Sequence, residues 1–317
     1  FCWKGPNLPT RTDFARSGAQ VLQALTYYAH KDKLKQIGKQ GMLAEINSAA
    51  VHIAHEVADE YGCLVAGNLG NTWVYDPIDP GTHKETRRQF DQQIEYQLPY
   101  GIDFFIAETI EYLGEGKIVV EAIQAIGKPA MITLGFKYQD STKDGVILED
   151  AFKELEEAGA EIVGINCFRD PERMLPLSAR VRQTVSCFVA TQPVAYRCSE
   201  EAPYFQIQKY QGHFAFPLEM DPFVLTRIEM ADYACKAQAM GINYIGGCCG
   251  TAPHHLRAMA EALGRSVPNS KYSPQLKFHP IIGEKGYIKE KDERILCEQR
   301  YGTSVCHFLD EKPDMGR

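Results

Sequence analysis

Residues 228–250 read IEMADYACKAQAMGINYIGGCCG, and this stretch contains one complete helix-to-strand unit. The helical period of residues 228–240 stops at Gly241, a residue type that commonly ends helices. A β-rich run at residues 243–247 follows at once. A helix that leads directly into a strand is typical of a parallel sheet, because neighbouring parallel strands need crossover connections.

The same alternation of β-rich runs and helical periods extends through most of the chain. Seven such runs occur, at residues 21–25, 63–67, 103–107, 129–134, 162–166, 187–191 and 243–247. Seven units fit either an open doubly wound sheet or a closed barrel. The lack of an early G-x-G-x-x-G turn disfavours a dinucleotide-binding sheet. We therefore predict an α/β fold, a (β/α)₈ TIM barrel whose first strand, before Val21, is absent or irregular in this chain.

The helical periods also predict which helix faces are buried. The period at residues 42–61 places four apolar residues on one face, Ile46, Ala50, Ile53 and Val57. The period at residues 148–158 does the same with Leu148, Phe152 and Leu155. After the last strand, Thr251 is expected to cap a helix. His254 and His255 would then face solvent or the rim of the barrel.

The composition of the 317 residues limits the possible functions. Hydrophobic residues make up 44% and charged residues 24%, which excludes a disordered or collagen-like chain. The net charge of −7 argues against a nucleic-acid partner. No apolar run reaches the roughly 18 residues of a membrane span. Ten irregularly spaced cysteines and the lack of a secretory signal predict a reduced, cytoplasmic protein whose thiols are free to bind metal.

We expect two domains. Residues 1–264 contain the strand–helix units and form the predicted barrel. Residues 265–317 are polar and carry no clear unit, so they are interpreted as a C-terminal extension, either an arm of a homo-oligomer or a frayed tail. Within the barrel, residues 196–226 form an unusually long connection that is rich in aromatic residues and prolines. Connections of this length are often functional.

Three cysteines stand at the ends of two predicted strands. Cys167 follows one strand, and Cys248 and Cys249 follow the last one. The carboxyl ends of the strands form the active-site face of an α/β barrel. Adjacent cysteines can share a metal only where the backbone leaves strand geometry, which the flanking glycines permit. Three thiolates suit Zn²⁺ and leave one position open; the alternative is a buried strand cysteine beside an incidental pair.

Two further groups are candidates for binding substrate. Glu108 directly follows an apolar strand and could bind an ammonium group, or could form a salt bridge at the rim. Tyr27 and Tyr28 follow the first run, and Trp3 and Tyr196 could join them in space. Electron-rich rings hold a quaternary ammonium group by cation–π attraction. The alternative is that these rings only pack.

At these residues the sequence resembles the zinc-dependent homocysteine S-methyltransferase family. The matching motifs contain the cysteines and lie at residues 164–171 and 244–253. The resemblance extends from residue 14 to residue 264. Three stretches are similar to the branch of the family that uses betaine, at residues 27–34, 105–108 and 192–196. Residues 250–253 also resemble the homocysteine module of cobalamin-dependent methionine synthase.

The resemblance implies a (β/α)₈ barrel in which Cys167, Cys248 and Cys249 hold Zn²⁺ and take part in catalysis. It implies that Glu108 binds the amino group of homocysteine. The implied enzyme is a methyltransferase that moves a methyl group from betaine or a similar onium donor to the homocysteine thiolate, giving methionine. The thiolate would occupy the fourth zinc position.

The resemblance also bears on the methyl donor. Tyr28 matches a family tyrosine at the donor site, and Trp3 corresponds to a tryptophan that contacts the donor. Tyr27, Tyr28 and Tyr196 are the candidates for holding the donor's cation. No general acid is needed, because the leaving group departs as a neutral amine or sulfide.

One feature departs from the family pattern. The family's first strand carries a Gly-Asp-Gly segment whose aspartate helps to hold homocysteine, and nothing here matches it. We expect either a truncated chain or a missing part. Two alternatives therefore stand beside the betaine-dependent enzyme. One is the same chemistry with S-methylmethionine, another sulfonium or a corrinoid as donor, and the other is a zinc-bearing barrel that binds a thiol without catalysis.

Overall fold

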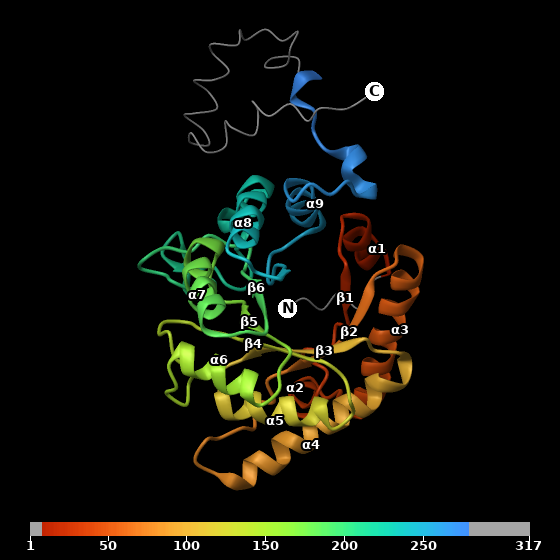
Figure 1. Ribbon diagram of the computed structural model, residues 1–317, viewed down its shortest axis with the longest axis vertical. Coiled ribbons are helices and arrows are strands. Elements are labelled where there is room, and N and C mark those ends of the chain that lie inside the picture. Colours follow the sequence, from red (N-terminus) through yellow and green to blue (C-terminus); the bar gives the residue numbers. More distant parts are fainter. Residues whose placement is uncertain (1–7, 279–317) are drawn as a thin grey trace. The chain divides into compact units, whose positions relative to one another are not determined.

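The computed structural model describes residues 8–278. Seven parallel strands form one curled sheet in their sequence order, and helices cover its outer face (Figure 1). The strands are β1 (Val21–Gln23), β2 (Leu64–Gly70), β3 (Phe104–Ile110), β4 (Ala130–Leu134), β5 (Ile162–Asn166), β6 (Phe188–Gln192) and β9 (Tyr244–Ile245). Each predicted run overlaps one of these strands, and the prediction of a (β/α)₈-type barrel is confirmed.

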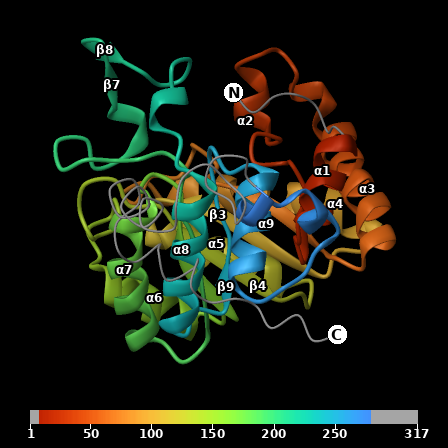
Figure 2. The ribbon, with the colours of Figure 1, turned by 90° about the horizontal axis from the view of Figure 1, so that it is seen from above.

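Helices connect the strands. They are α1 (Leu8–Arg16), α2 (Lys31–Lys35), α3 (Leu43–Tyr61), α4 (Pro80–Gln97), α5 (Leu113–Gln124), α6 (Leu148–Glu157), α7 (Pro171–Thr184), α8 (Arg227–Ala239) and α9 (Pro253–Ala262). Short 3₁₀ helices are η1 (Gln40–Met42), η2 (Leu98–Tyr100), η3 (Phe205–Ile207), η4 (Asp221–Phe223), η5 (Pro268–Tyr272) and η6 (Leu276–Phe278). The long connection between β6 and α8 contains a hairpin of β7 (Lys209–Tyr210) and β8 (His213–Phe214). Figure 2 shows this hairpin on the same side of the sheet as α2.

Successive side chains of a strand point to opposite faces, and this alternation divides the core into two layers. On β3, Phe105 and Ala107 join the large cluster that includes helix side chains. Phe104 and Ile106 belong instead to a small inner cluster. Its other buried members are Ala66 of β2, Met131 of β4 and Ala190 of β6. The inner face of the sheet is therefore filled by apolar side chains at the middle of the strands.

The sheet has two edges, β1 and β9, and no strand among residues 8–278 pairs between them. This gap lies where the sequence predicts an absent or irregular first strand. On the outside, the segment after α1 is bonded to the segment after α9. Arg265 donates from Nη1 to the carbonyl of Gly18 at 2.9 Å, and Asn269 donates from Nδ2 to Oγ of Ser17 at 3.0 Å. The segments that follow α1 and α9 are thus bonded to each other, although the strands β1 and β9 do not pair.

The buried face of α3 differs from the predicted one. Ile46 and Ile53 are only half-buried. The covered residues are Leu43, Asn47, Ala50, Val51, Ala54, Val57 and Ala58. The cause is a buried hydrogen bond. Nδ2 of Asn47 donates to the carbonyl of Ala29 at 2.8 Å, and this bond turns the side of α3 that carries Asn47 inward. On α6 the predicted residues Leu148, Phe152 and Leu155 are all buried.

The start of α9 corrects two predictions. The residue before the helix is Ala252, so Thr251 is not the cap. His255 is fully buried and does not face solvent, whereas His254 is exposed. Nδ1 of His255 accepts from the backbone N–H of Ala252 at 3.1 Å, and Nε2 lies 2.8 Å from the carbonyl of Leu225. The imidazole therefore caps the helix and anchors it to the preceding connection.

The barrel belongs to a compact unit that extends to Ser270. Most of residues 265–317 lies outside the described residues. The division of the chain at residue 264 and the arm formed by the extension therefore stay predictions. In the part of the chain that is described, no helix has both the length and the apolar surface to cross a bilayer.

Candidate metal and substrate site

Polar side chains gather at the carboxyl ends of the strands, above the inner apolar cluster. Asn68, Glu108 and Gln192 each lie two residues after an inner apolar residue of the same strand. Because side chains alternate along a strand, these three share the inner face with that cluster. The carboxyl ends of barrel strands are where active sites are found.

Cys167 follows β5 at a sharp turn of the backbone. Cys167 and Phe168 have φ of 61° and 57°, a left-handed conformation that residues other than glycine rarely adopt. The carboxylate of Asp170 holds this turn by accepting from the backbone N–H of Arg173 at 3.1 Å and of Cys198 at 2.8 Å. Strained residues that their surroundings fix in this way are frequent at functional sites.

Cys248 and Cys249 lie in a turn after β9, so the expected departure from strand geometry is observed. Gly250 has φ of 79°, and a Cβ there would lie 2.7 Å from the ring of Tyr196. Glycine is therefore required for the turn to pack against that ring. The carbonyl of Cys249 accepts from the backbone N–H of Ala195 at 2.8 Å, which fixes the turn to the segment after β6.

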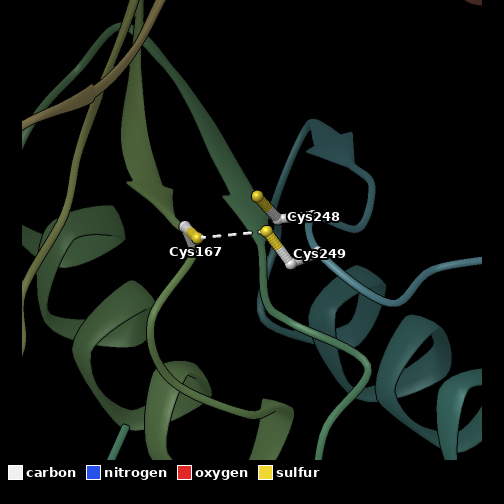
Figure 3. Close-up of side chains that lie close together, drawn as sticks. All are labelled: Cys167, Cys248 and Cys249. Carbon is white, nitrogen blue, oxygen red and sulfur yellow. Dashed lines mark hydrogen bonds between the residues drawn. The ribbon is translucent and has the colours of Figure 1, made fainter. Parts of the chain in front are cut away.

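The three sulfur atoms meet in space (Figure 3). The Sγ atoms of Cys167, Cys248 and Cys249 all lie within 4.8 Å of one another, and those of Cys167 and Cys249 are 3.7 Å apart. In a tetrahedral site with Zn–S bonds of about 2.3 Å, two sulfur atoms stand about 3.8 Å apart. Donor type and spacing therefore fit Zn²⁺, and three protein ligands leave one position for another ligand.

The three cysteine side chains also form hydrogen bonds with one another. The pKa of Cys249 lies well below its usual value because Cys167 and Cys248 hydrogen-bond to its sulfur. The pKa of Cys248 is raised well above its usual value by its hydrogen bonds with Cys167 and Cys249 and by burial. Hydrogen bonds within the cluster thus favour the thiolate form, which is the form in which cysteine binds a metal.

Glu108 is surrounded by side-chain amides. Its Oε1 accepts from Gln23 Nε2 at 2.8 Å and from Asn68 Nδ2 at 2.6 Å, and its Oε2 accepts from Asn166 Nδ2 at 3.3 Å. Burial raises the pKa of Glu108, while the hydrogen bond from Asn68 lowers it. The Oδ1 atom of Asn68 is buried and has no hydrogen-bond partner within the described chain. An unpaired acceptor beside a carboxylate suits a ligand that donates several hydrogen bonds, such as an ammonium group.

Asn166 links Glu108 to the cysteines. Its Nδ2 also donates to Oγ1 of Thr109 at 2.8 Å and lies 3.9 Å from Sγ of Cys248. Its Oδ1 accepts from the backbone N–H of Thr109, whose φ is 57°. One buried amide therefore fixes the position of the carboxylate relative to the sulfur cluster.

The aromatic residues that the sequence singled out fall into two groups. Tyr27 and Tyr28 follow β1, with ring centroids 4.9 Å apart. Tyr196 lies beside the cysteine turn and stacks on Phe205 at 5.6 Å. Trp3 lies outside the described residues. Burial raises the pKa of Tyr27 well above its usual value, and the neighbouring Glu108 carboxylate raises it further.

Several site residues escaped the sequence analysis. Lys33 lies within the tyrosine group, with Nζ 3.8 Å from the centroid of the Tyr27 ring. Trp73 follows β2 and lies 6.4 Å from Tyr28, centroid to centroid. The three amides around Glu108 were missed as well. For Asn68 and Asn166 the signal was available, because each stands at the carboxyl end of a predicted strand, whereas Gln23 lies in the middle of the predicted run at residues 21–25.

Comparison with known proteins places the chain in a family. The family model described as homocysteine S-methyltransferase matches residues 10–263, and the chain belongs to that family. It is 36% identical over 258 residues to betaine–homocysteine S-methyltransferase 1 of Danio rerio, a match that covers 79% of this chain and 63% of that protein. It is 32% identical over 284 residues to S-methylmethionine–homocysteine S-methyltransferase BHMT2 of Mus musculus, covering 86% and 71%.

The chain therefore spans less than two thirds of the length of the Danio rerio relative. Among solved structures, the metallated form of the homocysteine methyltransferase MmuM from Escherichia coli matches with a TM-score of 0.63. The identity in that match is 19%, with 80% of this chain and 83% of the other covered. A likeness at this identity concerns the fold, and it agrees with the barrel described above.

Proposed function

We propose that this protein transfers a methyl group from betaine or a similar onium donor to the thiolate of homocysteine, giving methionine, with Cys167, Cys248 and Cys249 as zinc ligands. The observation that carries the proposal is the meeting of these sulfur atoms within 4.8 Å at the carboxyl ends of β5 and β9. Family membership supports homocysteine as the acceptor. Bound Zn²⁺ would lower the pKa of the acceptor thiol while leaving its sulfur nucleophilic.

Glu108 is proposed to bind the amino group of homocysteine. Its carboxylate and the unpaired Oδ1 of Asn68 together offer acceptors for the N–H groups of an ammonium ion. Asn166 fixes this carboxylate relative to the sulfur cluster. Holding the acceptor by its amino group while its sulfur is at the cysteines would align it for attack, and alignment supplies much of the rate in such two-substrate reactions.

Tyr27, Tyr28 and Tyr196 are proposed to hold the cation of the methyl donor. The side chain of Tyr28 is 46% exposed, so part of its ring is open to a ligand. Tyr27 is a neutral phenol at physiological pH, because burial and the Glu108 carboxylate raise its pKa. Aromatic faces attract onium groups by about 0.5–2 kcal/mol per contact.

S-methylmethionine is the second candidate donor. The similarity to a relative named for that donor favours it, and a sulfonium carries the same positive charge as betaine nitrogen. Steady-state kinetics with each donor, followed by competition between the two, would choose between them. We expect the higher kcat/KM with betaine, and the reverse order would assign the sulfonium.

The metal assignment is tested with Cys248→Ala. We expect atomic emission to find zinc in the wild type and little in the variant, and methionine formation to be lost with it. Cys235→Ala is a matched control, because Cys235 bonds to the carbonyl of Ala262 and is not part of the sulfur cluster. Full zinc and full activity in Cys248→Ala would refute the assignment.

Calorimetric titration with homocysteine, followed by a turnover assay, tests catalysis itself. Homocysteine binding without methyl transfer from either donor would favour the thiol-binding barrel over the enzyme.

We also propose a cytoplasmic homo-oligomer, on the basis of the irregularly spaced cysteines and the polar extension. Fractionation and analytical ultracentrifugation of the full chain would test these two properties.

A further inference from the structure

The ammonium group of Lys33 is buried inside a group of aromatic rings. The residue is 4% exposed. Its Nζ lies 3.8 Å from the ring centroid of Tyr27, 5.3 Å from that of Tyr28 and 5.2 Å from that of Trp73. All three distances lie within the reach of a cation–π contact. The chain's own cation therefore lies nearest to the Tyr27 ring, while part of the Tyr28 ring stays exposed.

This ammonium group has no carboxylate partner within residues 8–278. It donates to the carbonyl of Tyr27 at 3.0 Å and to Oδ1 of Asn71 at 3.1 Å, which uses two of its three N–H groups. No Asp or Glu of the described segment forms an ion pair with it. A buried charge without a partner is costly. Accordingly, burial lowers the pKa of Lys33 to about 7, although Glu115 and Glu108 act in the opposite direction.

The titratable groups near Lys33 form hydrogen bonds with other residues or are neutral. Glu108 on β3 is held by its three amides. Glu115 on α5 accepts from the backbone N–H and the hydroxyl of Thr72 at 2.7 and 2.8 Å. Burial and Lys33 lower the pKa of His30 to about 3, so its imidazole is neutral. None of these groups contacts the Lys33 ammonium directly, and its third N–H is left for a ligand.

Lys33 lies on the same face as the rest of the site. Gly70, at the end of β2, pairs in register with Glu108. A Cβ at Gly70 would lie 2.9 Å from Nζ of Lys33 and 2.7 Å from the Tyr27 ring, so glycine leaves the space that both occupy. Trp73 has φ of 64°, and this strained conformation accompanies the contact of its ring with the cation.

We propose that Lys33 is a substrate-binding residue whose ammonium group pairs with a carboxylate of one of the two substrates. This inference rests on the proposed function, in which both homocysteine and betaine carry a carboxylate. The carboxylate of the ligand would be the ion-pair partner that Lys33 lacks among the described residues. A charge-assisted hydrogen bond in a buried site is strong. The protein would thereby select zwitterionic substrates over simple thiols or simple onium ions.

The test compares dissociation constants by calorimetry on the zinc-loaded protein. In the acceptor arm, homocysteine is compared with 3-mercaptopropan-1-amine, which lacks the carboxylate. In the donor arm, trimethylglycine is compared with its carboxamide. The variants are Lys33→Met, which removes the charge, and Lys33→Arg, which keeps it. Lys35→Met, an exposed lysine on the same helix, is the matched control.

We expect Lys33→Met to raise the Kd of the carboxylate-bearing compound about tenfold or more in one arm. The Kd of the analogue that lacks the carboxylate should not change, and the arm that responds identifies the substrate. Lys33→Arg should retain most of the difference in Kd between the carboxylate-bearing compound and its analogue. Lys35→Met should retain all of that difference. Equal changes for both members of each pair, or no change in a folded Lys33→Met protein, would overturn the inference.

This outcome is separable from that of the proposed function. If the wild type binds these compounds in a Lys33-dependent way but transfers no methyl group, the proposed function fails and the role of Lys33 stands. If methyl transfer proceeds and Lys33→Met keeps the wild-type preference for carboxylates, the role of Lys33 fails and the proposed function stands.

Discussion

At the scale of single residues, the site contains polar atoms that the fold leaves partly unsatisfied. Asn68 gives its amide N–H to Glu108 but leaves its buried carbonyl oxygen without a partner among residues 8–278. Lys33 has a buried ammonium group that forms no ion pair with a carboxylate of the described residues. Unsatisfied buried groups cost stability, so they are expected where a ligand completes them.

Glu108→Gln tests the ammonium site at this scale. The substitution keeps the side chain's size but removes the negative charge, so the KM for homocysteine should rise roughly 10- to 100-fold, as for loss of a charged hydrogen bond. The KM for the methyl donor should change much less. Steady-state kinetics with each substrate varied in turn measures both, and an unchanged homocysteine KM would count against the assignment.

Lys33 also predicts a pH dependence of stability. Burial lowers its pKa from 10.5 to about 7 in the folded chain, so between these values the unfolded chain binds more protons. Its unfavourable contribution is therefore fully present below pH 7 and is relieved as the pH rises from 7 towards 10.5. Urea unfolding across this range should show wild type gaining stability relative to Lys33→Met; parallel pH profiles would contradict this.

At the scale of elements, α4 holds the loop that carries the tyrosines and Lys33. The side of α4 that faces this loop is polar, although Phe90 and Ile94 of the same helix join the apolar core. Nε2 of Gln93 donates to the carbonyls of Thr26 at 3.2 Å and Ala29 at 2.9 Å, and Nε2 of Gln89 donates to Asp32 at 2.6 Å. A helix that buries glutamines against a loop shows little hydrophobic periodicity, although these amides fix the position of the aromatic rings.

Gln93→Leu tests this contact. The substitution removes two buried hydrogen bonds, although both carbonyls keep another donor, so the free energy of unfolding should fall by about 1–3 kcal/mol. The donor KM should rise as the loop loosens, with the zinc content unchanged. Urea unfolding, kinetics and metal analysis would be compared with Gln92→Leu, a half-buried neighbour that bonds Tyr96 on its own helix. Equal effects in the two variants would argue against a special role of Gln93.

At the scale of the whole barrel, the cysteines connect segments far apart in the chain. Cys167 follows β5, and Cys248 and Cys249 follow β9, beyond the long connection that contains the β7–β8 hairpin. A metal ion held by all three would tie these segments together in the folded state alone. The stability of the barrel should then depend on the metal, because a ligand that binds only the folded chain stabilises it.

Chelation of the metal should therefore lower the Tm of the wild type by several degrees. A thousandfold excess of ligand over Kd is worth about 4 kcal/mol. The Tm of Cys248→Ala should not respond to the chelator. Differential scanning calorimetry with and without chelator measures both Tm values. An unchanged wild-type Tm after the metal is removed would show that the cysteine cluster does not bind the metal in the folded state.

The order and type of the main elements could be predicted from the sequence. All seven β-rich runs contain a strand of the sheet. They could be found because β-rich composition, helical periodicity and helix-ending glycines are patterns of residues that are close in the sequence. The convergence of Cys167 with Cys248 and Cys249 was also predictable, since the carboxyl ends of parallel strands meet on one face. Local pattern and one rule of barrel geometry suffice for these features.

Tertiary structure alone decided how polar side chains are partnered. The hydrogen bond from Gln23 to Glu108 joins residues 85 positions apart, and that from Asn166 to Glu108 joins residues 58 apart. His255 caps its helix through its own ring, and Lys33 lies among rings from two loops. Such contacts depend on the distance and direction between side chains from different strands and loops, which periodicity along one segment does not specify.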